Sequence, residues 1–118
     1  MNVGHHFSVK SVSEYLKTRA KRHSKRETIY NYLKYFENAC FINRVCRENI
    51  MGKVILKTNE KFYLTDHGFK QAVYSHNKRD AQLILENIVY MELIRRGWEV
   101  TIGNVGKNEI DFLAKKMD

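Results

Sequence analysis

The first third of the chain places its apolar residues at helical spacing. A helix predicted over residues 24–41 has apolar side chains at intervals of four, three and four, namely Ile29, Leu33, Phe36 and Cys40. Ser24 and Glu27 have the spacing of a capping box, in which each side chain satisfies a free backbone amide at the helix start. The rest of this helix is largely basic, so one face can pack while the other meets a partner.

A shorter helix is predicted before this one, and a small ribbon of strands after it. The spacing of Ser11 and Glu14 is that of a second capping box, which opens a helix ending near Ala20. Alternating apolar residues predict short strands over 41–47, 54–57 and 61–64, separated by turns at 49–53 and 58–61. Gly52 can supply a positive φ in the first turn. Two helices with a short basic linker and a following hairpin are the order of a winged helix-turn-helix.

The remainder of the chain predicts further helices and strands. In order, these are a short helix over 65–74, a polar boundary at 75–79, a long helix over 81–96 that ends at Gly97, and strands over 98–102 and 109–114 separated by a turn. Alternation in the last strand places Ile110, Phe112 and Ala114 on one face, and Asp111 and Leu113 on the other.

These elements predict an α+β fold in two parts. We expect a winged helix-turn-helix domain over residues 1–75, followed by an incomplete α/β segment over residues 76–118 that consists of a helix and two strands. The chain stops directly after a strand, so we expect that it was cut inside something larger. An unfinished sheet exposes an edge that can pair with another chain, which predicts dimerisation, as in a homodimer, or other edge pairing there.

Positive charge is concentrated in the first half of the chain. The formal net charge is +8, and residues 1–60 contain 12 Lys and Arg against 5 Asp and Glu, whereas residues 61–118 contain 9 against 8. This imbalance favours a polyanionic partner. The candidate DNA-binding residues are those on the basic helix and the predicted wing: Lys25, Arg26, Asn31, Lys34, Lys53 and Lys57. An ordinary surface helix with solvated lysines would have the same pattern.

Composition and motifs exclude several other classes. Cys40 and Cys46 are too few for a disulfide framework or a four-ligand zinc site, and reduced thiols are typical of a cytoplasmic protein. We see no signal peptide and no apolar run long enough to span a bilayer, so no membrane partner is expected. The chain contains no phosphate-binding loop, no HExxH motif and no nucleophile–histidine arrangement, and we predict no cofactor and no metal site in it.

One pair of carboxylates remains as a candidate for chemistry. Glu86 lies in the long helix and Asp111 in the last strand, and a helix Glu and a strand Asp can meet at one Mg²⁺ that activates water for phosphodiester cleavage. Such nucleases also need a lysine on a following strand, which this sequence does not contain. The alternative is that Glu86 serves in an ion pair or cap and that Asp111 is structural. Both are therefore vestigial catalytic candidates only.

Several short motifs, in combination, resemble the C-terminal region of a family of prokaryotic AAA-type P-loop ATPases. They are Thr28-Ile29-x-x-Tyr32-Leu33, Phe36-Glu37-Asn38-Ala39-x-x-Ile42, Lys61-Phe62-Tyr63-Leu64-Thr65-Asp66-x-Gly68, Leu85-Glu86-Asn87-x-x-Tyr90-x-x-Leu93-x-x-Arg96-Gly97 and Glu109-Ile110-Asp111-Phe112. The similarity runs from about Ser8 to Lys115. It implies a winged helix followed by a restriction-endonuclease-like fold of the PD-(D/E)xK type, usually regarded as a domain of unknown function.

The resemblance also implies a larger parent protein. An N-terminal P-loop module would bind ATP and Mg²⁺, whereas this region lacks the Walker motifs and should do neither. Glu86 and Asp111 match the first two acidic positions of the PD-(D/E)xK pattern, and its third element would lie beyond Asp118. Three functions stay open: a non-catalytic DNA-binding or regulatory module of such an ATPase, a module that binds the ATPase part or a second copy, and a metal-dependent nuclease remnant.

Overall fold

The computed structural model describes residues 9–19, 25–66, 68 and 81–117. Within these ranges the chain forms three helices and four strands, in the order α1 (Val9–Thr18), α2 (Arg26–Asn38), β1 (Ile42–Asn49), β2 (Val54–Leu64), α4 (Ala81–Arg95), β3 (Trp98–Val105) and β4 (Asn108–Lys116). The fold is therefore a mixture of helices and strands, as expected at the level of fold class.

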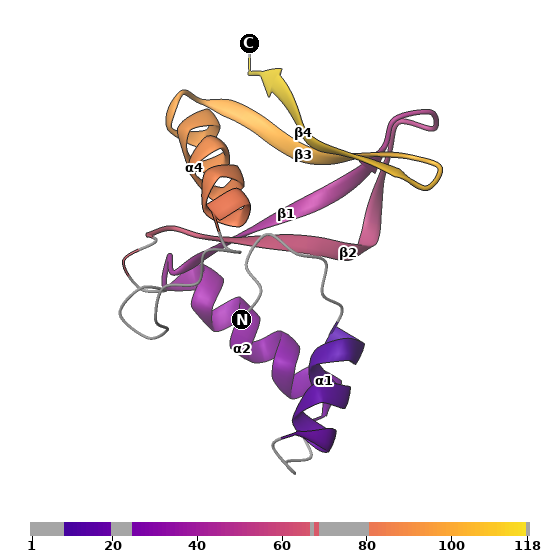
Figure 1. Ribbon diagram of the computed structural model, residues 1–118, viewed down its shortest axis with the longest axis vertical. Coiled ribbons are helices and arrows are strands. Elements are labelled where there is room, and N and C mark those ends of the chain that lie inside the picture. The colour runs from indigo at the N-terminus through magenta and orange to yellow at the C-terminus, as the bar shows by residue number, and fades with distance from the viewer. Residues whose placement is uncertain (1–8, 20–24, 67, 69–80, 118) are drawn as a thin grey trace.

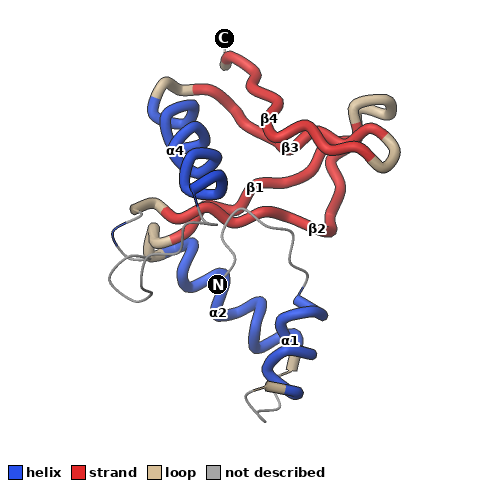
Figure 2. The backbone as a smooth tube through the Cα atoms, in the orientation of Figure 1, coloured by secondary structure: helices blue, strands red, loops and turns tan. Residues whose placement is uncertain are grey.

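Two antiparallel hairpins combine into one sheet. The strand order is β2-β1-β3-β4, with β1 antiparallel to β2 and β3 antiparallel to β4. The hairpins are joined by parallel pairing of β1 with β3, in which Arg47 lies opposite Ile102 and Asn49 opposite Asn104. Figures 1 and 2 show the two hairpins side by side, with both turns at the same end of the sheet. The sheet therefore contains strands from both sides of the predicted boundary between residues 75 and 76.

Helices α4 and α2 cover opposite faces of this sheet. The Asn43 side chain donates to the Met91 sulfur on α4, whereas its neighbour Arg44 forms an ion pair with Glu37 on α2. Adjacent residues of a strand point to opposite faces, so the two helices lie on different sides. In Figure 1, α2 and α1 extend away from the sheet.

The main core lies between α4 and the sheet. Its buried members are Val45, Tyr63, Tyr90, Val100 and Ile102, and Met91, Leu93, Trp98 and Phe112 pack against it. The rings of Tyr63 and Tyr90 are stacked with centroids 4.5 Å apart. Aromatic stacking adds to the stabilisation by burial, so this pair fixes α4 against the first hairpin.

The predicted capping boxes are both wrong. Helix α1 begins at Val9, which places Ser11 inside the helix. The N-cap of α2 is Lys25, without a side-chain hydrogen bond to the helix start, and Ser24 lies outside the described residues. Helix α2 ends at Asn38 because Cys40 adopts a positive φ of 60°. A backbone in that conformation cannot continue a right-handed helix.

The predicted apolar stripe of α2 is only partly buried. Ile29 is buried and Leu33 is half-buried, but Phe36 remains 47% exposed and Cys40 lies past the helix end. The helix touches the sheet mainly where it approaches β1, so only part of its length is covered. An exposed apolar side chain gains little from the hydrophobic effect, and α2 therefore relies on few anchors.

The ribbon is longer than predicted. A turn at 58–61 does not form, and β2 runs without a break from Val54 to Leu64. The pairing with β1 is irregular at this polar stretch, because residues 57–60 of β2 all lie opposite the single residue Cys46. In the turn between β1 and β2 it is Lys53, not Gly52, that adopts a positive φ.

The second hairpin also differs from the sequence prediction. Its turn contains only Gly106 and Lys107, and Gly106 has a φ of 59°. The register shifts between Thr101 and Gly103, so that two residues of β4 lie opposite Ile102. This bulge breaks the predicted alternation of β4.

The prediction for α4 is confirmed, including its end at Gly97, which has a φ of 79°. The helix predicted over 65–74 lies almost wholly outside the described residues.

Candidate functional site

The exposed side of α2 contains the predicted DNA-binding residues of that helix. Lys25, Arg26, Asn31 and Lys34 are all exposed. Ile29 is the only buried residue of the helix, and together with the half-buried Leu33 it holds the helix against the rest of the molecule. This limited packing leaves most polar side chains of α2 open to a partner.

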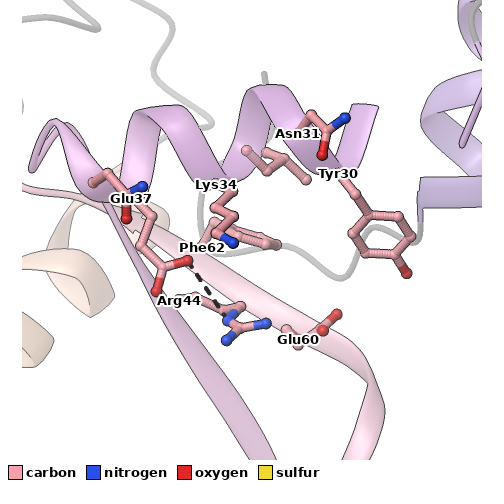
Figure 3. Close-up of a pocket in the computed structure, with 9 residues that line it drawn as sticks. Tyr30, Asn31, Lys34, Glu37, Arg44, Glu60 and Phe62 are labelled. Atoms are coloured by element: carbon pink, nitrogen blue, oxygen red, sulfur yellow. Dashed lines mark ion pairs between the residues drawn. The ribbon is translucent and has the colours of Figure 1, made fainter. Parts of the chain in front are cut away.

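A groove runs between α2 and the first hairpin. Its volume is about 340 Å³, and it is lined by Tyr30, Asn31, Leu33, Lys34, Glu37, Asn38, Arg44, Glu60 and Phe62. Figure 3 shows Lys34 and Glu37 extending from α2 toward the strands that bear Arg44 and Glu60. Glu37 and Arg44 form an ion pair across the groove at 3.7 Å, and both are partly exposed. Such a pair is weak in water, so Arg44 can exchange partners at little cost.

The exposed tyrosines of α2 were not among the residues predicted to bind a partner. Tyr30, Tyr32 and Tyr35 are 50%, 59% and 64% exposed, and the rings of Tyr32 and Tyr35 meet edge to face. The number of tyrosines in this stretch of the sequence could have indicated a binding surface, because a basic helix with several tyrosines is typical of a surface that contacts another molecule. The predicted apolar stripe passed through Phe36 instead, and it left these tyrosines without a role.

The two lysines of the predicted wing do not join this surface. Lys53 is exposed in the turn between β1 and β2, at the end of the sheet that Figure 1 shows far from α2. Lys57 lies in the irregular part of β2, and its side chain is not among those described. Of the six predicted residues, the structure therefore brings together Asn31 and Lys34 in one groove, with Lys25 and Arg26 at the start of the same helix.

A second candidate site is a cluster of buried charges on the α4 side of the sheet. The Lys61 ammonium of β2 lies 2.8 Å from Glu86 Oε1 on α4 and 2.6 Å from Glu109 Oε1 on β4. The Tyr63 hydroxyl donates to the same Glu86 oxygen at 2.6 Å, and Arg47 of β1 pairs with Glu109 Oε2. The cluster thus links β1, β2, β4 and α4.

Burial and charge act in opposite directions on Lys61. Desolvation alone would lower the pKa of its ammonium, but its hydrogen bonds to Glu109 and Glu86 outweigh that effect, and the pKa is raised. The pKa of the Tyr63 hydroxyl is also raised, first by burial and then by Glu86. Lys61 therefore stays protonated and Tyr63 stays neutral at any ordinary pH.

The two vestigial catalytic candidates have different surroundings. Glu86 is held by Lys61 and Tyr63, in agreement with the ion-pair alternative. Asp111 is exposed on β4, close enough to contribute to the raised pKa of Tyr63. Among the described residues, no three His, Cys, Asp or Glu side chains are placed to hold a metal ion. Lys61 was not predicted as a site residue. The lysine of a metal-dependent nuclease site was expected on a strand after Asp111, whereas Lys61 precedes Glu86 in the sequence.

Comparisons with known proteins give relatives without an assigned function. A protein from Haemophilus influenzae is 36% identical over 117 residues, which are 99% of this chain and 29% of that protein. A protein from Methanocaldococcus jannaschii is 37% identical over 110 residues, 90% of this chain and 24% of that protein. Both are described only as uncharacterized, and the chain spans less than a third of either. No family model and no solved structure matches the chain.

The described helices include none that combines the length and apolar character needed to cross a bilayer.

Proposed function

We propose that this chain is a nucleic-acid-binding module that contacts the phosphate backbone with the exposed side of α2. The observation that carries the proposal is the exposure of Lys34, which lines a groove whose other wall bears Arg44, together with the exposure of Lys25 and Arg26 where the helix begins. Cations on a phosphate surface release condensed counterions, which supplies most of the affinity of non-specific binding. The basic half of the chain, residues 1–60, contains this surface.

Neutral groups on the same surface fit a polynucleotide as well. Asn31 can donate to phosphate or base oxygens, and Tyr30 and Tyr35 offer exposed rings and hydroxyls. Glu37 holds Arg44 only at 3.7 Å, so a phosphate can replace it as the partner of the guanidinium. The module is proposed to be non-catalytic, with sequence-independent contacts dominating.

A salt titration of DNA binding tests the proposal. Fluorescence anisotropy of a labelled duplex should show an affinity that falls steeply as the salt concentration rises. In the double variant Lys25→Glu/Lys34→Glu, binding should weaken. The slope of log affinity against log salt should fall by about 2, because each lysine that neutralises a phosphate adds about 1 to it.

The matched control reverses the same number of charges elsewhere. Lys107 is exposed in the turn before β4 and Lys116 at the end of that strand, and Figure 1 shows this hairpin on the other side of the first hairpin from α2. The variant Lys107→Glu/Lys116→Glu should keep most of the affinity and the salt slope. Absence of binding by the unaltered chain at low salt, or equal losses in the two double variants, would reject α2 as the binding surface.

The wider setting is part of the same proposal. The family resemblance supports a role as the DNA-binding or regulatory region of an AAA-type ATPase, and the relatives leave room for such a module because the chain covers less than a third of each. On this proposal a P-loop module in the same polypeptide binds ATP and Mg²⁺. The reading frame that encodes the complete polypeptide should then contain a Walker A motif.

Self-association is a second candidate function, favoured by the surface of α4. Leu85, Ile88 and Val89 are 62%, 49% and 41% exposed on the side of the helix that faces away from the sheet. Ile88 and Val89 follow Leu85 by three and four residues, which forms an apolar stripe. A stripe of this kind can pack against the same stripe of a second copy, because twofold interfaces use one patch on both subunits.

A further inference from the structure

Lys61 is the cation around which the buried charge cluster is built. Its side chain is only 4% exposed, and two carboxylates from different elements reach its ammonium at 2.6 and 2.8 Å. Glu86 approaches from α4 and Glu109 from β4, while Tyr63 supplies a further hydrogen bond to Glu86. The carboxylates therefore converge on one point, and a side chain of the same protein occupies that point.

Converging carboxylates are also the ligands that Mg²⁺ and Mn²⁺ use in proteins. A divalent ion would need oxygen ligands at the place where the Lys61 ammonium now lies. Both carboxylates already have cationic partners, because Lys61 pairs with Glu86 and Glu109, and Arg47 pairs with Glu109 as well. A second cation beside a buried ammonium would meet like-charge repulsion at low dielectric, which outweighs the attraction of carboxylates already paired.

We propose that Lys61 is the resident cation of this cluster and takes the place of a divalent metal, so that Glu86 and Glu109 clamp α4 to the sheet without metal. The proposal goes beyond the proposed nucleic-acid binding and does not depend on it. It assigns Lys61 two roles, holding the helix and closing the carboxylate pair to Mg²⁺ and Mn²⁺. The same closure argues against the nuclease hypothesis, which needs a metal between these elements.

Titration of the full chain with Mn²⁺ tests this assignment. The free Mn²⁺ signal in electron paramagnetic resonance should show no saturable binding to the unaltered protein at millimolar concentrations. The variant Lys61→Ala removes the resident cation and leaves the carboxylates facing a small cavity. It should gain a saturable Mn²⁺ site, and Mn²⁺ should raise its melting temperature.

The control separates this cluster from other carboxylates on the surface. Lys61→Ala/Glu86→Gln lacks one of the two ligands and should lose the Mn²⁺ site. Lys107→Ala removes an exposed lysine and should gain no site. A folded Lys61→Ala protein, judged by circular dichroism, that binds no Mn²⁺ would overturn the proposal.

A measurement on the unaltered chain covers the case in which Lys61→Ala does not fold. Mn²⁺ broadens NMR signals of nuclei near its binding site. The proposal expects the signals of Tyr63, Glu86 and Glu109 to stay sharp during the titration. Selective broadening of these signals would show that the cluster accepts the metal with Lys61 in place, which would refute the assignment whatever the variant does. Since neither experiment contains DNA, its failure leaves the proposed function untouched.

Discussion

Asn87 shows how one buried polar side chain ties a helix to a strand. It is 1% exposed on α4, its amide donates to the Leu64 carbonyl at 2.8 Å, and its carbonyl accepts from the Leu64 amide at the same distance. Strand β2 lies at the edge of the sheet, where backbone groups lack a neighbouring strand. The carboxamide of Asn87 thus supplies both the donor and the acceptor that a further strand would offer.

Replacement of Asn87 by alanine is expected to destabilise the fold. The change removes two hydrogen bonds and leaves the amide and carbonyl of Leu64 without that partner, so we expect a loss of about 1–3 kcal/mol in the free energy of unfolding. Urea unfolding followed by circular dichroism measures it. Asn108→Ala, at an exposed position beside the turn of the second hairpin, should change the stability by less than about 0.5 kcal/mol. Equal effects of the two changes would contradict this role for Asn87.

At the residue scale the sequence could not reveal such roles. Asn87 and Lys61 both stood in segments that carried the family resemblance, but their partners lie on other elements. The spacing of residues along a helix indicates which face each side chain occupies. It does not indicate which strand will lie opposite that face. The exposure of Lys25 and Lys34 was predictable, because a cation on an amphipathic helix is placed on the solvated side.

Elements with strong local signals were predicted well. Helix α4 is apolar through most of its length and ends at Gly97, where a positive φ and two preceding arginines mark a helix end. The capping boxes failed because Ser and Glu three residues apart are common in any sequence, and that spacing alone does not fix where a helix begins. The polar run over 58–61 resembles a turn in composition, but β1 holds the backbone of β2 in strand conformation on both sides of it.

Gly103 in β3 lies in tightly packed surroundings, where an added side chain has little room. A Cβ atom at this position would lie 2.9 Å from the Ile110 Cβ and 3.1 Å from the Ile50 Cδ1. Gly103→Ala must therefore displace β4 or distort β3, and we expect a loss of about 1–3 kcal/mol in thermal or urea unfolding. Gly52→Ala is the matched control, because its nearest contact would be at an ordinary 3.7 Å from Val54. If both alanine variants are as stable as the parent, the two hairpins are packed more loosely than described.

For the whole molecule, the parallel pairing of β1 with β3 lay beyond sequence reasoning. The alternation of apolar and polar residues predicted the strands of both hairpins. No pattern within a strand indicates that Arg47 lies opposite Ile102. The division of the chain into domains over residues 1–75 and 76–118 stays a prediction, although strands from both parts share one sheet. The winged helix and the restriction-endonuclease-like fold likewise stay predictions.

Self-association is the prediction that belongs to the whole molecule. If two copies meet through Leu85, Ile88 and Val89, light scattering coupled to size exclusion should give the mass of a dimer at micromolar concentrations. The variant Leu85→Glu/Ile88→Glu should then be a monomer with an unchanged circular dichroism spectrum, because both side chains already face solvent. The matched variant Tyr32→Glu/Tyr35→Glu, on the exposed side of α2, should keep the dimer mass. A monomer before any substitution would rule out this interface.

The pairing of β1 with β3 has a consequence for how the chain comes off the ribosome. The first hairpin can close as soon as β2 has been synthesised, since its partners are near in sequence. The edge of β1 that pairs with β3 stays unpaired until β3 has been synthesised, which happens only after α4. The pairing of β1 with β3 closes a long loop, and this closure has an entropic cost that short loops avoid. Until then the growing polypeptide exposes a strand with backbone donors and acceptors unmatched, and that interval is when a holdase would have the most to shield.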